Sequence, residues 1–365
     1  MTAYRPGEVI VEAGSWNDGA TADILRNLPG IPCRTVEDAG GVSASRDTLV
    51  LARHRGRFLK RCQGSGAEMC CNYFIASYAW NCHFGCTYCV LQSYLDGSGI
   101  VVCTNIEDFL GDIGRTLAES PDRTFRIGTG ELADSLALDP ITGYSRRVVP
   151  FFARLPNGIL ELKTKSDRVE NLEGLEHGGR TVVSWSMNSR RICRSEEARA
   201  ATLKERLAAA DRCRRWGYRI GFHFDPIVHY EGWEEEYREV VRMIFSVVDP
   251  GDVAWISLGS LRFTPHLRER LIERHPGSRL PWGEFVPGHH GKLRYFRPVR
   301  EDIYRKMHSW IRECAPGVLV YLCMESRLVW ERSLGCAVRD ARHLSDCLDA
   351  AAPGRFRPST RANGL

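Results

Sequence analysis

The chain has 365 residues, of which 43% are hydrophobic and 26% are charged. This balance is that of an ordinary globular protein, and it excludes a fibrous or wholly disordered chain. The length predicts two domains or one large α/β unit, since a domain averages about 150 residues. The net charge of +5 includes +3 from arginines in residues 351–365, so charge alone neither requires nor excludes a nucleic-acid partner.

Nothing in the sequence has the features of a membrane span or a signal peptide. The longest apolar runs, such as Val318–Met324, are far shorter than the roughly 20 residues that a membrane helix needs. The first residues also lack a positively charged start followed by an apolar core. We therefore expect a cytoplasmic protein that does not bind membranes.

The patterning along the chain predicts three regions. Residues 1–75 hold short apolar stretches, Val9–Val11 and Thr48–Ala52, between turns rich in Gly and Asp, which predicts a small N-terminal α/β extension. Residues 76–335 alternate between strand-like and helix-like runs. Residues 336–365 are expected to form a C-terminal helix followed by a disordered basic tail.

The middle region predicts a partial barrel. Its clearest helix runs from about Ser195 to Trp216, with apolar residues at three- and four-residue spacing. Six strand candidates are short, apolar or β-branched, and most are bounded by Gly, Pro or Asp. They are Arg126–Thr129, Ile159–Lys163, Thr181–Met187, Tyr218–Phe224, Val253–Leu258 and Val318–Cys323. This alternation predicts parallel βα units, so we expect an α/β fold with a partial (β/α)6 TIM-type barrel and chemistry at the carboxyl ends of its strands.

Cysteine is the most informative residue type, because the chain has fourteen and no secretory signal. That combination favours metal ligands or reactive thiols over a disulfide framework. One group, Cys62, Cys70 and Cys71, has a spacing that suits no common metal cluster. A second group lies in residues 82–89. The others are isolated and are expected to be plain thiols: Cys33, Cys103, Cys193, Cys213, Cys314, Cys323, Cys336 and Cys347.

The segment 82–89 places three cysteines on a tight loop, with three residues between the first two and two between the last two. Three thiolates in this pattern can bind three irons of a [4Fe–4S] cluster and leave the fourth iron open. A structural zinc site would need a fourth Cys or His, and His83 adjoins Cys82 and is badly placed for that role. The spacing favours the cluster, with zinc or unliganded thiols as the alternatives.

The motif CxxxCxxC, with Tyr88 before its last cysteine, resembles the signature of the radical S-adenosylmethionine (SAM) enzymes. Further stretches resemble the spore photoproduct lyase-like family within that superfamily. In chain order they are Phe58–Lys60 with Cys62, Cys71–Ala76, Cys82–Gln92, Thr164 and Lys165, Trp185–Ser189, Pro226 with Glu231–Trp233, and Arg262–Thr264. The likeness covers well over half of the chain.

Membership of that family implies a lyase that repairs DNA. It would use a [4Fe–4S] cluster to cleave SAM to methionine and a 5′-deoxyadenosyl radical, and this radical would abstract hydrogen from a thymine lesion. A flavodoxin- or ferredoxin-type protein would supply the electron. As alternatives, the chain modifies a free nucleoside or another small metabolite, or it is a non-catalytic iron–sulfur or zinc protein that binds DNA.

The resemblance also implies roles for single residues. Cys82, Cys86 and Cys89 would hold the cluster. Tyr88 would lie against the SAM adenine, and Lys165 would pair with the SAM carboxylate. The alternative for Lys165 is an exposed loop lysine.

Two further strand ends would complete the SAM site. Ser186 would form a hydrogen bond to SAM with Asn188 close by, unless both satisfy only backbone groups at the end of their strand. The turn at Gly130 and Glu131 would approach the SAM ammonium group, with a substrate contact or a structural turn as the alternatives.

Two departures from the family pattern bear on the chemistry. The family uses a cysteine just after the strand that ends near Thr129, whereas residues 128–135 contain none and Glu131 stands near that place. The family also uses a tyrosine directly after the last cluster cysteine, and here that residue is Val90. A carboxyl group is a poor hydrogen-atom donor, so we expect a substitute donor in Cys323, with Cys103 as a second possibility. The alternative role of both is that of a plain core cysteine.

Arg262, Lys292 and Arg294 fall in the region where the family places its DNA-contacting loops. Cationic side chains there would hold phosphates while a damaged nucleotide pair enters the pocket. The alternative is an exposed loop with ordinary solvated charges.

Overall fold

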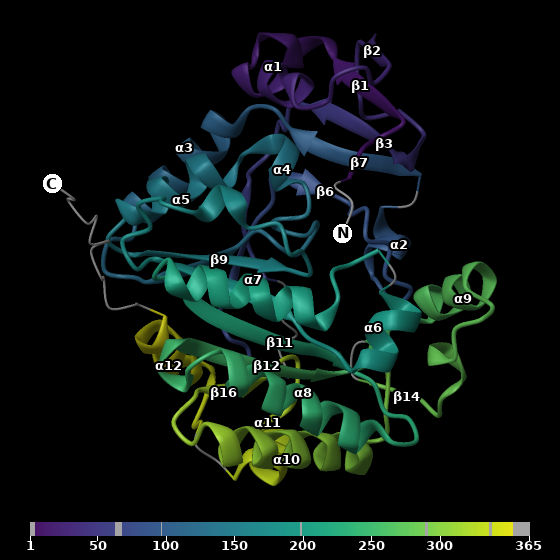
Figure 1. The fold of residues 1–365 in the computed structure, drawn as a ribbon, viewed down its shortest axis with the longest axis vertical. Coiled ribbons are helices and arrows are strands. Elements are labelled where there is room, and N and C mark those ends of the chain that lie inside the picture. The colour runs from purple at the N-terminus through teal and green to yellow at the C-terminus, as the bar shows by residue number, and fades with distance from the viewer. Residues whose placement is uncertain are drawn as a thin grey trace, which may run out of the picture.

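Short runs of β-branched and apolar residues form a sheet at the N-terminal end of the chain (Figure 1). The computed structural model describes residues 4–62, 68–95, 97–197, 199–288, 291–335 and 338–352. The sheet has the order β2-β1-β3-β7-β6, and its first four strands are parallel. In that order the strands are β2 (Cys33–Val36), β1 (Glu8–Glu12), β3 (Ala44–Ala52), β7 (Ser98–Cys103) and the antiparallel β6 (Ala79–Trp80).

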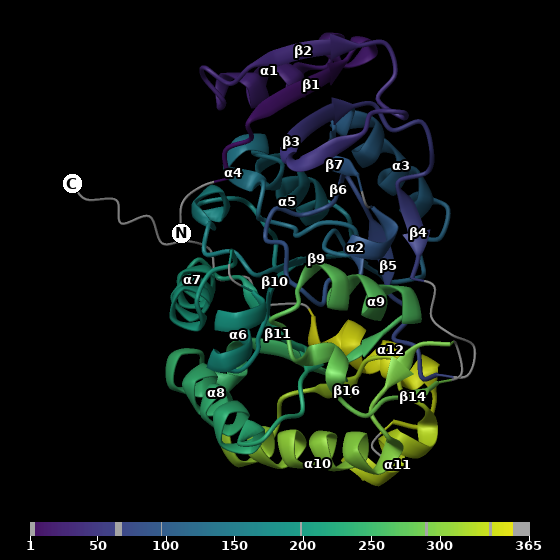
Figure 2. The same cartoon turned by 90° about the vertical axis from the view of Figure 1, so that its right-hand side faces the viewer.

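A second sheet, of eight strands, curls into an open half-barrel, which is the fold class that the sequence predicts (Figure 2). Every neighbouring pair is parallel except β4 with β5. In spatial order the strands are β16 (Val320–Leu322), β12 (Val253–Ser260), β11 (Arg219–Ile227), β10 (Thr181–Ser186), β9 (Gly158–Thr164), β8 (Phe125–Gly128), β5 (Phe74–Ala76) and β4 (Leu59–Arg61). β16 and β4 are the free edges.

All six predicted strands are confirmed, with ends that differ by at most three residues. The two sheets interleave along the chain, because β4 and β5 join the half-barrel whereas β6 and β7 return to the N-terminal sheet. The boundary expected between residues 75 and 76 therefore does not coincide with a change of sheet, and the three-region division remains a prediction. The tail residues 353–365 lie outside the described residues.

Helices cover the outer face of the half-barrel (Figures 1 and 2). α5, α7, α10 and α12 pack against its strands, and α8 contacts both α7 and α10. In chain order the α-helices are α1 (Gly19–Arg26), α2 (Leu91–Tyr94), α3 (Ile106–Ala118), α4 (Asp139–Thr142), α5 (Ser145–Ala153), α6 (Arg190–Glu196), α7 (Leu203–Arg215), α8 (Trp233–Val247), α9 (Pro265–Arg274), α10 (Arg297–Cys314), α11 (Arg327–Leu334) and α12 (Ala341–Ala351). None of the described helices is both long and apolar enough to cross a bilayer.

Shorter elements complete the structure. A small antiparallel sheet has the order β13-β15-β14 and lies beside α9. Its strands are β13 (Arg262–Phe263), β15 (Leu293–Arg294) and β14 (Val286–Pro287). The 3-10 helices are η1 (Ala13–Asn17), η2 (Glu170–Leu172), η3 (Pro250–Asp252) and η4 (Leu280–Trp282).

The single helix predicted over Ser195–Trp216 is wrong, because residues 197–202 separate two helices, α6 and α7. The Thr202 side chain accepts a hydrogen bond from the N–H of Glu205, and the Glu205 carboxylate accepts one from the N–H of Thr202 (2.7 Å). This reciprocal capping box starts a new helix. Glu197 consequently lies outside both helices, and its side chain is buried.

A buried carboxylate occupies the interior of the half-barrel. Glu161 on β9 is 3% exposed and accepts hydrogen bonds from the Tyr73 hydroxyl (2.7 Å) and the Ser184 hydroxyl (2.5 Å). The Trp255 indole N–H also donates to it (3.1 Å), and His223 Nε2 lies 2.7 Å away. Burial alone would raise the pKa of Glu161, but His223 and the donors outweigh that effect and lower it to about 2.

Gly128→Ala tests the close packing inside the half-barrel. A Cβ at Gly128 would lie 1.6 Å from the Tyr73 hydroxyl oxygen, so the backbone or the ring would have to move. We expect the free energy of unfolding in urea to fall by about 1–3 kcal/mol. Gly111→Ala is the control, because a Cβ there, within α3, meets nothing within 4 Å. That change should raise the free energy by up to about 1 kcal/mol, and equal effects of the two variants would contradict the packing.

Candidate active site

The three-cysteine loop lies between β6 and α2, on the side of the half-barrel that faces the viewer in Figure 2. Asn81 turns the chain with a left-handed backbone (φ 72°), and its Oδ1 accepts a hydrogen bond from the N–H of Cys82 (3.0 Å). Its Nδ2 donates to the carbonyl of Gly99 on β7 (2.9 Å). Its backbone N–H donates to the carbonyl of Leu132, in the loop after β8 (2.8 Å). Asn81 therefore anchors the loop to both sheets.

The thiols of Cys82, Cys86 and Cys89 gather with Phe84 in one small apolar cluster. Burial raises the pKa of all three thiols, to about 12 for Cys86. Backbone N–H groups of Phe84 and Leu91 donate to the sulfurs of Cys82 and Cys89 and favour their thiolate forms. Such N–H···S bonds also support cluster-bound sulfurs, so the donor set fits a [4Fe–4S] cluster. A single metal ion needs converging ligands, and the described residues hold no such group of three His, Cys, Asp or Glu side chains.

The buried carboxylate of Glu197 lies behind the loop, and side chains from several elements surround it. Arg206 Nη2 donates to Glu197 Oε2 (2.5 Å), and both side chains are at most 1% exposed. The Tyr88 hydroxyl donates to the other carboxylate oxygen, and Lys165 Nζ lies 5.6 Å from the centroid of the Tyr88 ring. Arg206 Nη1 also donates to the carbonyl of Ser186 (2.8 Å). One ion pair thereby brings three predicted SAM-site residues, Tyr88, Lys165 and Ser186, together.

The charges of this group compensate one another. Burial alone would raise the pKa of Glu197, but Arg206 and Lys165 outweigh it and lower the pKa to about 2. Burial alone would lower the pKa of Lys165, but the negative charge of Glu197 outweighs it and raises that pKa. At neutral pH the carboxylate is therefore an anion and the lysine a cation.

The turn after β8 packs tightly onto the end of β9. Asp134 accepts hydrogen bonds there from the Thr164 hydroxyl (2.5 Å) and the N–H of Lys165 (2.7 Å). Gly130 comes so close that a Cβ would lie 2.9 Å from the carbonyl oxygen of Lys163. This close contact with β9 leaves no room for a side chain at Gly130, and the SAM contact expected of this turn stays a prediction.

Glu131 lies near the cysteine loop and also near Cys62. It is exposed, and its negative charge raises the pKa of Cys89 in the loop and of Cys62 on the other side. A ligand bound beside the loop would lie within reach of this carboxylate.

A second group of side chains gathers inside the half-barrel, and we call it the lumen group: Lys163, Asp225, Arg262, Lys292 and Cys323. Arg262 forms a bidentate ion pair with Asp225 (3.1 and 3.2 Å), and its Nη2 lies 3.7 Å from the sulfur of Cys323. Lys163 and Lys292 also lie near Cys323. Three cations, one carboxylate and one thiol therefore share the lumen.

The three residues predicted to contact nucleic acid are largely engaged by the protein itself. Arg294 is 8% exposed, donates to the Met324 carbonyl (2.7 Å) and pairs with Glu68 (3.3 Å). Lys292 is half-buried, with Nζ 3.9 Å from the sulfur of Met324. Arg262 is held by its carboxylate partner in the lumen group. Any phosphate would thus meet these cations inside the half-barrel.

Asn188 connects the end of β10 with β11 and α8 through hydrogen bonds. Its Oδ1 accepts a hydrogen bond from the Tyr237 hydroxyl on α8, and its Nδ2 donates to the carbonyl of Pro226 on β11 (3.1 Å). The side chain is 1% exposed. Its contacts are those of a residue that positions the end of β10, where Ser186 lies.

Sequence reasoning missed Glu197 and Arg206, and it gave no individual role to Lys163 and Asp225, although both lie at strand ends where chemistry was expected. Lys163 had a visible signal, because it precedes Lys165 by two residues and strand alternation places such residues on one face. Glu197 and Arg206 fell within the predicted surface helix, where charged residues are ordinary. Their nine-residue separation carries no local signal.

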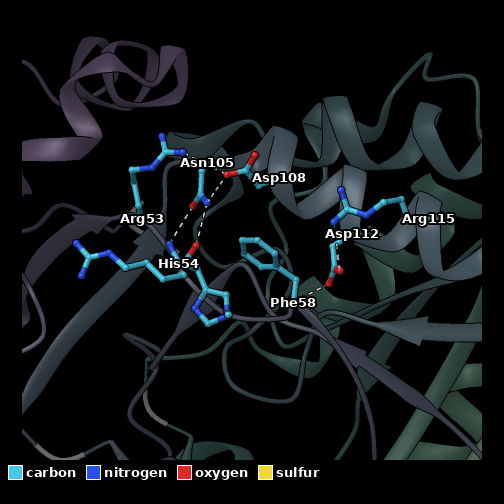
Figure 3. Close-up of a pocket in the computed structure, with 9 residues that line it drawn as sticks. Arg53, His54, Phe58, Asn105, Asp108, Asp112 and Arg115 are labelled. Carbon is cyan, nitrogen blue, oxygen red and sulfur yellow. Dashed lines mark hydrogen bonds and ion pairs between the residues drawn. The ribbon is translucent and has the colours of Figure 1, made fainter.

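A separate pocket next to α3 contains no residue of the cysteine loop (Figure 3). Its volume is about 360 Å³, and its walls are Arg53–Gly56, Phe58 and one face of α3. Asn105 Oδ1 accepts from the N–H of His54 (3.0 Å), while its Nδ2 donates to the His54 carbonyl (3.0 Å) and to Asp108 (2.8 Å). These polar groups satisfy one another, so the pocket is not part of the candidate active site.

The half-barrel and its three-thiol loop together form the architecture that the sequence resemblance implied for a radical SAM enzyme. The sequence model of the family described as "Spore photoproduct lyase" matches residues 42–321. This range is more than half of the chain. The chain therefore belongs to the spore photoproduct lyase family.

Relatives and solved structures agree with this assignment. Curated proteins named spore photoproduct lyase are 25% identical in Geobacillus sp. (strain Y412MC61) over 254 residues and 26% identical in Bacillus subtilis (strain 168) over 256 residues. The alignments cover 66% and 67% of this chain and 74% of each relative. A solved spore photoproduct lyase mutant with bound AdoMet and dinucleoside spore photoproduct has a TM-score of 0.80 at 24% identity, over 88% of this chain and 100% of that one. The structural likeness confirms the fold.

Glu197→Gln is expected to destabilise the protein strongly. The Arg206 guanidinium would stay buried without its anionic partner, which costs about 3–5 kcal/mol of unfolding free energy. Folding lowers the pKa of Glu197 from 4.5 to about 2, so its stabilising contribution is present at neutral pH and is lost as the pH falls through that range. Urea unfolding of both proteins across these pH values measures the difference, which should shrink in acid.

Glu313→Gln is the matched control for that change. Glu313 pairs with Arg238 at 3.0 Å, and the two side chains are about half exposed. Such surface pairs contribute at most about 1 kcal/mol. If the Glu197 variant lost no more stability than this control, the ion pair would not organise the site.

Proposed function

We propose that the chain is a radical SAM lyase that repairs a thymine lesion in DNA. Family membership supports this function, as do relatives named for it and a solved relative that binds AdoMet and dinucleoside spore photoproduct. The observation that carries the proposal is the convergence of the cysteine loop, Tyr88 and Lys165 on the buried carboxylate of Glu197. When bound, the cluster and SAM supply a 5′-deoxyadenosyl radical that abstracts a hydrogen atom.

The side chains around the loop would hold these groups. Cys82, Cys86 and Cys89 would ligate three irons. Lys165, kept cationic by its carboxylate neighbour, would pair with the SAM carboxylate, and Tyr88 would offer its ring to the adenine. Further SAM contacts would come from two strand ends, with Asn188 in a positioning role. Ser186 would contribute from the end of β10, and Gly130 with Glu131 would lie at the SAM ammonium group after β8.

The lumen group would receive the substrate. Lys292 would contact phosphate together with Lys163, while Arg262 and Arg294 would position the walls through their carboxylate partners. Burial raises the pKa of Cys323 to about 12, so its sulfur keeps a proton at neutral pH. Cys323 would return a hydrogen atom to the product radical, with its S–H bond breaking as a C–H bond forms.

Two partners follow from this chemistry. The substrate would be DNA or a nucleotide, whose phosphates suit the cations of the lumen group. A flavodoxin- or ferredoxin-type protein would deliver the electron, because none of the proposed side-chain roles supplies one.

The decisive test is anaerobic reconstitution with iron and sulfide, followed by dithionite and SAM. 5′-Deoxyadenosine is assayed with and without DNA that was irradiated with ultraviolet light in the dry state. We expect 5′-deoxyadenosine and recovered thymine from the wild-type chain and neither from Cys82→Ala, which loses a cluster ligand. SAM cleavage without recovered thymine would favour a free nucleoside or another small metabolite as substrate. No cleavage by a fully loaded protein would overturn the radical SAM function.

Cys323→Ala tests the hydrogen donor separately. We expect the variant to cleave SAM as the wild type does but to recover at least about tenfold less thymine, because the product radical would lack its hydrogen-atom donor; a tenfold loss corresponds to about 1.4 kcal/mol of activation free energy. Cys33→Ala is the control, because Cys33 is exposed on β2 in the N-terminal sheet. Normal thymine recovery by Cys323→Ala would place the donor elsewhere.

A further inference from the structure

Residues 68–73, which we call the seam segment, close the open side of the half-barrel. The free edges there are β4 and β16. The N–H of Cys62, directly after β4, donates to the Tyr73 carbonyl (2.9 Å). The N–H of Met69 donates to the carbonyl of Glu325, just beyond β16 (2.9 Å). The seam segment therefore touches both edges, and its two cysteines have no role in the proposed function.

The sulfur of Cys70 is surrounded by groups that favour its thiolate form. The thiol of Cys71 donates a hydrogen bond to it, and so does the backbone N–H of Asn72 (3.4 Å). Asn72 has a left-handed backbone (φ 56°), which asparagine tolerates. Arg61 and Arg126 add positive charge nearby. The pKa of Cys70 is accordingly lowered, chiefly by the hydrogen bond from its neighbour.

The pKa values of the thiols around Cys70 are shifted in the opposite direction, because they are raised. The hydrogen bond that Cys71 donates raises its pKa well above the usual value, and burial adds to this effect. Burial raises the pKa of Cys62 and of Cys323 as well. Cys70 itself is only half-buried. Thiolate character, positive surroundings and partial exposure are the features of a reactive cysteine.

We propose that the Cys70–Cys71 pair is a modification site for low-molecular-weight disulfides. The thiolate of Cys70 attacks one sulfur of the disulfide, and a new S–S bond forms as the S–S bond of the reagent breaks. The other half of the reagent leaves as a thiolate and takes a proton from water. Cys70 is oxidised and the leaving half is reduced. This reactivity does not depend on the proposed function.

An adduct on Cys70 would also disturb contacts at some distance from its sulfur. It would displace the hydrogen bonds from Cys71 and Asn72, which hold the turn. The carbonyl of Cys71 accepts a hydrogen bond from Arg126, and Arg126 pairs with Asp349 on α12 (2.6 Å). We expect modification to loosen the seam segment and α12 together.

The test treats the reconstituted full-length protein anaerobically with glutathione disulfide at a slightly acidic pH. Samples are quenched with acid, and adducts are mapped by mass spectrometry. We expect Cys70 to react at least about tenfold faster than Cys33, an exposed cysteine whose pKa is raised by partial burial and by Glu8. The rate at Cys70 should also reach its plateau at a lower pH.

Two variants test whether Cys70 reacts because of its neighbour Cys71 or only because it is accessible. Cys71→Ala removes the donated hydrogen bond and should slow the reaction of Cys70 several-fold, whereas Cys33→Ala should leave its rate unchanged. Equal rates at the two cysteines of the wild type, or an unchanged rate in Cys71→Ala, would overturn the site. Hydrogen exchange in residues 68–73 and α12 should increase after modification, and unaltered exchange would overturn the coupling to α12.

Discussion

The buried charge of Glu197 is the constraint on which the rest of the candidate site depends. A carboxylate stays ionised in a protein core only where cations and hydrogen-bond donors surround it. Arg206, Lys165 and Tyr88 meet that need from α7, the end of β9 and the cysteine loop. These elements are far apart in the sequence, and they meet at this carboxylate. Charge compensation, in addition to apolar packing, therefore fixes where the loop lies relative to the half-barrel.

Polar side chains on β9 and directly after it lie one after another along the half-barrel. Glu161, Lys163 and Lys165 follow one another at two-residue spacing. The first lies in the buried hydrogen-bond network, the second in the lumen group and the third beside the cysteine loop. One strand face thus carries the interior network, the proposed substrate wall and the proposed SAM contact.

The sequence predicts what local signals determine, namely the six strands and the cysteine loop. The break at residues 197–202 also had a local signal, the Thr202 and Glu205 capping box, but the amphipathic pattern on either side obscured it. The interleaving of the sheets could not be predicted, because β3 and β7 pair across a stretch of chain that contains β4 and β5 of the other sheet. The inward position of Arg262 depends likewise on Asp225, an acid remote in sequence.

The N-terminal sheet has a consequence for how the chain can be shortened. The family match begins at residue 42, whereas β1 and β2 precede that position. β1 pairs with β3 along Thr48–Leu51, where three aliphatic side chains are fully buried or nearly so. A fragment trimmed to the family match would leave β3 with a bare edge of unpaired backbone groups, the kind of surface on which strands of separate molecules associate. β1 thus covers an edge of β3 that would otherwise be open to pairing, and it supports the sheet to which the cysteine loop is anchored.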